Sequence, residues 1–133
     1  MKSLKLALAM TLAVVLPVAA APAEPRPLPA DALERAIVCA GDMGEVALNL
    51  NEANKKQPSE DTANVAGLMS AASMQWILHA RTLGAGKGLT EGQVDQKIDD
   101  YLTARASAGT PMERNQRRID NLNLCLAALK DLK

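Results

Sequence analysis

The amino-acid sequence predicts an all-α protein, a small up-down four-helix bundle with one disulfide joining the first and last helices. Composition is the first observation, because the 133 residues include no Phe, one Trp and one Tyr. Strands favour aromatic and β-branched side chains, whereas Ala, Leu and Met, which carry much of the apolar content here, favour helices. The other two observations are a series of helix-start signals and a pair of cysteines near the two ends of the predicted folded region.

The N-terminal segment has the layout of an export signal. Lys2 and Lys5 precede an uncharged apolar run over 6–18, and Ala21 and Ala23 supply the small residues that a signal peptidase requires. Four prolines then favour an extended chain, because each ring fixes φ and restricts the residue before it. The predicted domains are a signal peptide over 1–23, a Pro-rich tether over 24–30 and a single helical domain over 31–133.

This layout places the mature protein in the periplasm, with secretion as the alternative. The apolar run of the signal is shorter than the roughly 20 residues that span a bilayer, and no later stretch reaches that length without charges. Cys39 lies too far downstream of the signal to carry a lipid anchor at the cleavage site. We therefore expect no membrane insertion after the signal is removed.

Two long amphipathic segments are predicted after the tether. Asp31, with Glu34 as its capping partner, starts a helix that should end near Asn54. Ser59 caps the next helix, which should run to about Leu83. The first apolar stripe comprises Leu33, Ala36, Ala40, Met43, Ala47 and Leu50, and the second comprises Val65, Met69, Ala72, Trp76, His79 and Leu83.

A glycine-rich stretch over 84–88 should form a turn, because glycine loses much backbone entropy in a helix. Thr90 and Gln93 then form a capping-box pattern for a third helix that ends near Ala106. Its apolar stripe is Val94, Ile98, Tyr101 and Leu102.

The last helix and the cysteines define the topology of the bundle. Thr110, Pro111 and Glu113 supply the cap, the first-turn proline and the acidic partner of a helix start. In an up-down bundle the first and last helices are antiparallel neighbours, which brings Cys39 and Cys125 to a similar level. Export makes a disulfide between them chemically reasonable. The apolar residues of the last helix are Met112, Ile119, Leu122, Leu126 and Leu129.

Charge and composition exclude several function classes. Without the two signal lysines, 13 basic residues stand against 15 acidic ones, a net charge of −2 that favours neither nucleic acid nor anionic lipid. A base-stacking surface needs several exposed aromatic rings, which the composition lacks. The sequence contains no pattern typical of a catalytic or cofactor-binding site, so we expect no enzyme and no cofactor.

Three arginines in the first turns of the last helix form a candidate partner-binding site. Arg114, Arg117 and Arg118 lie where the helix dipole makes positive charge locally unfavourable. An acidic partner is one explanation for the cluster. The preferred interpretation is internal, since antiparallel packing would bring this end near Glu45 and Glu52 of the first helix.

A second set of residues suggests a ligand-lining site on the second helix. Trp76 and His79 lie on one stripe, and Met69 and Met74 extend the set toward a copper or haem centre. Steps of five residues turn the side chains about 140° past a full turn, so they fan out and do not converge. We therefore predict no metal site and interpret His79 as a core or groove-edge residue.

The plan of signal, tether, four helices and a cysteine pair joining the ends resembles several small periplasmic groups in layout. These include immunity proteins against cell-wall amidases and acid-stress chaperones. The function expected is a protein-binding module, such as an inhibitor, an immunity protein or a chaperone-like adaptor, with another exported protein as its partner. The alternative is a carrier of a small ligand, metal or haem that uses the cluster of Trp76, His79 and methionines.

Overall fold

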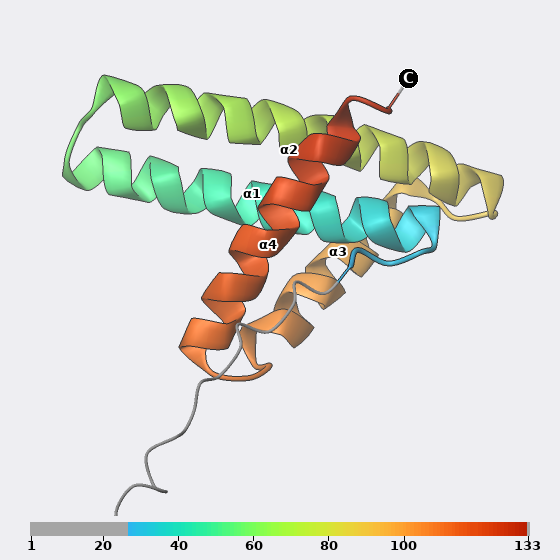
Figure 1. Cartoon of the computed structure of the whole chain (residues 1–133). Coiled ribbons are helices and arrows are strands. Elements are labelled where there is room, and N and C mark those ends of the chain that lie inside the picture. Colours follow the sequence, from blue (N-terminus) through green and yellow to red (C-terminus); the bar gives the residue numbers. More distant parts are fainter. Residues whose placement is uncertain (1–26, 133) are drawn as a thin grey trace, which may run out of the picture.

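The computed structural model describes residues 27–132, and the protein is a bundle of four helices over these residues (Figure 1). The all-α prediction is therefore confirmed. The predicted signal peptide over 1–23 and the start of the tether lie outside the described residues. The helices are α1 (Ala32–Lys56), α2 (Glu60–Gly86), α3 (Glu91–Ala106) and α4 (Pro111–Leu129).

Each helix begins at the residue that the sequence marks as its cap. The side chains of Asp31, Ser59, Thr90 and Thr110 each accept a hydrogen bond from the backbone N–H three residues on. At Thr90 and Thr110 the side chain three residues on also bonds back to the cap backbone, which completes both predicted capping boxes. At Asp31 the bond runs one way only, from the Glu34 N–H to the carboxylate at 2.9 Å.

The prediction of a turn over 84–88 is wrong for its first three residues, because α2 continues to Gly86. Packing explains the difference. A Cβ atom at Gly84 would lie 2.4 Å from the Val94 side chain, so glycine at this position lets α3 approach α2 closely. The chain turns at Gly88 instead, whose φ of 80° favours a residue without a side chain.

Helix α1 is in contact with all three other helices. α1 and α2 form a hairpin and lie antiparallel along their whole length. α3 and α4 lie obliquely across the half of this hairpin that contains the start of α1 (Figure 1). The Ser73 hydroxyl of α2 donates a hydrogen bond of 2.9 Å to the Ala40 carbonyl of α1. On the other side, Gly41 lets Tyr101 and Leu102 of α3 pack directly on α1. The first half of α1 is thus surrounded by the other three helices.

The predicted disulfide joins Cys39 of α1 to Cys125 of α4, with Cα atoms 5.5 Å apart. Both cysteines are fully buried, and the bond links residues 86 positions apart in the chain. The sulfur bridge lies where α4 crosses α1, inside the hydrophobic core. α1 and α4 are therefore joined by a covalent bond at the same place where their apolar side chains pack together.

The core lies where α3 and α4 cover the α1–α2 hairpin. The buried members include Met43 of α1, Trp76 of α2 and Val94 of α3, and Leu28 from the segment before α1 packs against them. From residue 27 to residue 132, no helix has the length and apolar content to cross a membrane.

Candidate functional site

A buried polar cluster lies inside this apolar core, where α1 meets α3 and α4. The Asp42 carboxylate of α1 is fully buried. Tyr101 Oη donates a hydrogen bond of 2.9 Å to its Oδ1 atom, and Asn121 Nδ2 donates one of 2.7 Å to Oδ2. The Arg105 guanidinium forms an ion pair with the same carboxylate. Three side chains from two helices thus bind one buried carboxylate. Such partners are needed because an unpaired charge is costly to bury.

The surroundings shift the pKa values of two members of this cluster. Burial raises the pKa of the Tyr101 phenol to about 12. Burial also lowers the pKa of Arg105 to about 10, with further lowering from the positive charges of Arg118 and Arg117. At neutral pH the phenol is therefore protonated and able to donate, and the guanidinium remains cationic opposite Asp42.

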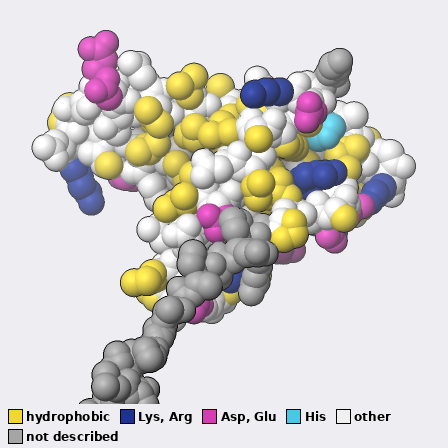
Figure 2. Space-filling view, in the orientation of Figure 1, with side chains coloured by type: hydrophobic (Ala, Val, Ile, Leu, Met, Phe, Trp, Pro, Cys, Tyr) yellow, Lys and Arg dark blue, Asp and Glu magenta, His cyan; other side chains and the backbone are white. Residues whose placement is uncertain are grey.

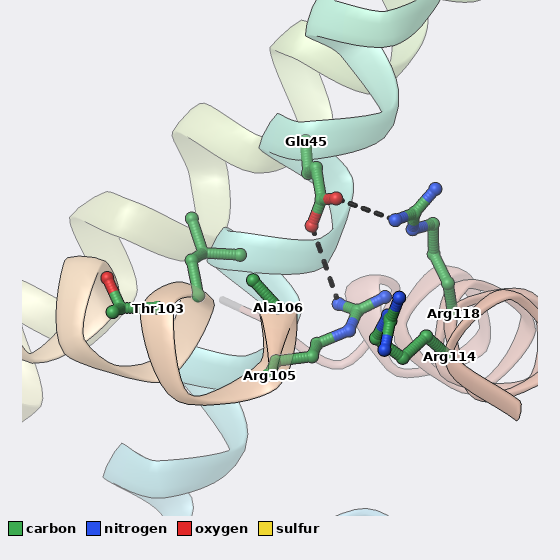
Figure 3. A pocket seen from close by; sticks show the side chains of 7 residues that line it. Glu45, Thr103, Arg105, Ala106, Arg114 and Arg118 are labelled. Atoms are coloured by element: carbon green, nitrogen blue, oxygen red, sulfur yellow. Dashed lines mark hydrogen bonds and ion pairs between the residues drawn. The ribbon is translucent and has the colours of Figure 1, made fainter. Parts of the chain in front are cut away.

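A second carboxylate, Glu45, extends the cluster toward the surface one turn further along α1. Its Oε1 atom lies 2.6 Å from Arg118 Nη2, and its Oε2 atom lies 3.8 Å from Arg105 Nη1 (Figure 3). The expected internal pairing of the arginine cluster is therefore present at Glu45. For Glu52 the expectation is wrong, because this residue pairs with Lys55 of its own helix at 2.8 Å.

These groups line a pocket of about 450 Å³ between α1, α3 and α4, here called the arginine pocket. Figure 3 shows the guanidinium groups of Arg105, Arg114 and Arg118 gathered around it, with Glu45 across from them. Thr103, Ala106 and Leu102 of α3 complete the lining. Arg114 donates a hydrogen bond of 2.7 Å from Nη1 to the Gly109 carbonyl, which holds its side chain near the N-terminus of α4.

Three arginine nitrogen atoms around the pocket are buried without a hydrogen bond to any residue from 27 to 132: Arg105 Nη1, Arg105 Nη2 and Arg118 Nε. Of these, Arg105 Nη1 lies in the ion pair with Asp42. Only 5% of the Arg105 side chain is exposed, so bulk water has little access to it. A buried donor left without an acceptor costs about 1–3 kcal/mol, and more when the group is charged. The pocket therefore holds donor capacity that the fold itself leaves unused.

The three arginines of the sequence-predicted cluster do not act alike. Arg114 and Arg118 line the arginine pocket, but Arg117 does not. Arg117 is half-buried on α4, and its charge lies close enough to Tyr101 and Arg105 to affect the pKa of both. Arg105 belongs to the pocket but was not among the residues that the sequence singled out, because it lies on a different helix from the cluster.

The Trp76 and His79 pair lies elsewhere, on the buried side of α2. Trp76 is 2% exposed, and its ring meets that of His79 edge to face with centroids 6.0 Å apart. Met69 is half-buried and Met74 is 53% exposed, so the side chains fan around α2 as their spacing predicts. Within residues 27–132 there is no cluster of three or more His, Cys, Asp or Glu residues that could hold a metal.

An exposed apolar surface covers the half of the hairpin that α4 leaves free. Val65 and Leu68 belong to the same line of α2 as buried Ala72, yet they are 44% and 66% exposed. The expectation that Val65 is buried is therefore wrong, because α4 crosses further along the hairpin. On α1, Val46 and Leu50 are half-buried and continue the line of Cys39, the side that faces α4.

We call Val46, Leu50, Val65 and Leu68 the apolar face. Figure 2 shows hydrophobic side chains gathered on this side of the hairpin, beside α4. α4 contributes two further exposed apolar residues, Ile119 and Leu126. Scattered exposed apolar residues are ordinary, but a contiguous group along two adjacent helices is typical of a surface that binds another molecule.

A smaller feature lies at the start of α1, where Leu33, Ile37 and Leu89 floor a pocket of about 440 Å³. Lys87 and Asp31 pair across its rim at 3.0 Å. The Glu34 N–H and Lys87 both lower the pKa of the Asp31 carboxyl. Two acidic residues, Asp31 and Glu34, and two basic residues, Lys87 and Lys97, line this pocket, so its charges balance and it has no marked preference for a charged ligand.

Comparisons of the chain with protein-family models, with curated proteins and with solved structures find no match. The two surfaces described above, the arginine pocket and the apolar face, are the features of the protein from which a function can be inferred.

Proposed function

We propose that the protein is an exported, periplasmic helical module that binds another exported protein. The observation that supports this proposal is the apolar face, where Val65 and Leu68 are exposed on a continuous helical hairpin. The centres of protein interfaces are richer in apolar side chains than the rest of the surface. An exposed apolar face on a helical hairpin suits an apolar helix of a partner, which would pack against side chains three and four residues apart.

The disulfide supports the compartment in this proposal. Disulfides persist in the periplasm and outside the cell, and are rare where thiols are kept reduced. Because Cys39 and Cys125 hold α4 across α1, the boundary of the apolar face is fixed by a covalent bond. An inhibitor, an immunity protein or a chaperone-like adaptor would each use a rigid apolar surface in this way.

Two matched double variants on α2 test the proposal. The first, Val65→Ser with Leu68→Ser, removes apolar surface from the apolar face. The second, Met74→Ser with Leu78→Ser, removes comparable exposed surface elsewhere on α2, since Met74 and Leu78 are 53% and 54% exposed. Val65 and Met74 are nine residues apart and therefore lie roughly 180° apart around the helix.

The measurement is affinity capture from the periplasm, with each retained protein identified and its affinity measured with purified material. A partner should bind the unaltered protein and the Met74/Leu78 variant equally and bind the Val65/Leu68 variant at least about tenfold more weakly, because two large contacts are lost. Equal affinity for all three proteins would show that the apolar face is not the binding surface.

A further inference from the structure

The arginine pocket is a second candidate binding site, separate from the apolar face because the two share no residue. Its central feature is Arg105, whose side chain is 5% exposed and lines the pocket together with Arg114 and Arg118. The Nη2 atom of Arg105 is buried and has no hydrogen-bond partner among residues 27–132. Arg118 adds a buried Nε atom without an acceptor among the described residues. The side chains are positioned by the fold, and their free donors require acceptor oxygens.

The charges around the pocket favour an anion of low charge. Arg105 pairs with Asp42 and Arg118 pairs with Glu45. Arg114, the third arginine of the lining, has no carboxylate partner among residues 27–132, so one positive charge of the pocket lining is unpaired there. Electrostatic complementarity is therefore reached with a single negative charge, as on a carboxylate, and would be exceeded by a phosphate dianion.

The shape and the remaining lining indicate the rest of the ligand. The Glu45 carboxylate lies between the guanidinium groups of Arg118 and Arg105 (Figure 3). This arrangement is an internal example of a carboxylate bound by the arginines of the pocket. Planar guanidinium groups match the two oxygens of a carboxylate. Leu102 and Ala106 provide apolar contact beside these donors. We propose that the arginine pocket binds a carboxylate group carried on a short aliphatic chain.

Such a group has two natural sources. One is the side chain of an acidic residue in a protein segment, and the other is a free short-chain carboxylic acid. Both would place the carboxylate between Arg105 and Arg114 and the methylene groups against Leu102 and Ala106. The chemistry of recognition is the same, so the binding assay must separate the sources.

The direct test is a titration of the isotope-labelled protein with butyrate at neutral pH and constant ionic strength, followed by NMR. Saturable shifts of the Thr103 and Ala106 backbone amides are expected, because both residues line the pocket. Inorganic phosphate, titrated in the same way, should bind more weakly than butyrate. The absence of saturable shifts with butyrate, or tighter binding of phosphate, would overturn the proposal.

A variant of the pocket provides the second arm. Arg114→Gln removes one charged donor that bonds to the exposed Gly109 carbonyl, so the fold should be retained. Butyrate affinity should fall about tenfold, the loss expected for one charge-assisted hydrogen bond. The matched control, Arg35→Gln, removes an arginine of α1 that does not line the pocket and should bind butyrate as the unaltered protein does. Equal affinities for the Arg114→Gln and unaltered proteins would contradict the proposal.

A blocked tripeptide with a central glutamate, compared with its glutamine counterpart, separates the two sources. Tighter binding of the glutamate peptide than of butyrate supports the proposal and assigns the pocket to an acidic protein segment. Tighter binding of butyrate supports it and assigns the pocket to a free acid. Equal binding of the glutamate and glutamine peptides would show that the carboxylate is not what the pocket recognises in a peptide, and would limit the ligand to the free acid.

Discussion

The two halves of the α1–α2 hairpin differ in what covers them. Toward the start of α1, three helices surround the chain, and this half contains the disulfide, the buried Asp42 carboxylate and most of the core. Toward the loop at residues 57–59 only α1 and α2 pack on each other, and Leu68 is 66% exposed. The comparison indicates that stability is concentrated in the covered half, which leaves the other half available for a partner.

Asp42→Ala should give the largest difference between the halves. The change leaves Arg105 buried without its main counter-charge, and removing one partner of a buried ion pair typically costs about 3–5 kcal/mol. Glu52→Ala, which breaks the exposed pair with Lys55 in the other half, should change the free energy of unfolding by about 0.5 kcal/mol or less. Urea unfolding followed by circular dichroism measures both free energies. Similar losses for the two variants would contradict the claim that the two halves of the hairpin differ in stability.

Removal of the disulfide should have the next largest effect. The double change Cys39→Ala and Cys125→Ala releases a long loop in the unfolded chain, for which a loss of about 2–4 kcal/mol is typical. At this size each kcal/mol corresponds to roughly 4–8 °C, so the melting temperature should fall by about 10 °C or more. Calorimetry of the oxidised protein and the double variant measures the shift in melting temperature. A fall of only one or two degrees would show that the disulfide does not stabilise the fold by restraining the unfolded chain.

Tyr101 is the only tyrosine in the chain, so its ionisation can be followed without interference. Its folded pKa is about 12, whereas an unfolded chain titrates near 10. The stabilisation from the protonated phenol is therefore complete below about pH 10 and is lost as the pH rises through 12. The lowered pKa of Arg105 acts in the opposite direction, because the folded state releases that proton first.

Tyrosinate absorbance isolates the phenol from this opposing contribution. The native protein should titrate at least one pH unit above the urea-unfolded protein. Coincident titrations would show that the Tyr101 phenol is not buried in the folded protein in solution.

The smallest effect is expected on the apolar face. Val65→Ser with Leu68→Ser should change the free energy of unfolding by less than about 1 kcal/mol, because both side chains are already in contact with water. Met43→Ala, at a fully buried position in the covered half, should cost about 2–5 kcal/mol. Thermal melts of the two variants measure both losses of stability. A large loss from the surface pair would indicate that the apolar face is part of the core.

Sequence patterns predicted the helices and their pairing, because caps and apolar periodicity act locally. Asp31, Ser59, Thr90 and Thr110 all begin helices as expected. The ends were less predictable, since α2 continues through Gly84, where contact with Val94 outweighs the cost of glycine in a helix. The disulfide followed from topology and compartment together.

The candidate site was predictable only in part. Arg114 and Arg118 stood out as a charge cluster in one helix, and both line the arginine pocket. Asp42 and Arg105 lie on different helices, and only the crossing of α3 over α1 brings them together. One sequence signal could have indicated Asp42, because it is an acidic residue immediately beside the buried positions of the α1 stripe.

Native-state hydrogen exchange of the backbone amides measures the stability of each half of α1 in the same molecule. Amides of residues 39–43, enclosed by three helices, should exchange only through global unfolding. Amides of residues 50–56 should open locally, with a free energy well below the global value. Equal protection along the whole of α1 would contradict the claim that stability is concentrated where α3 and α4 cross the hairpin.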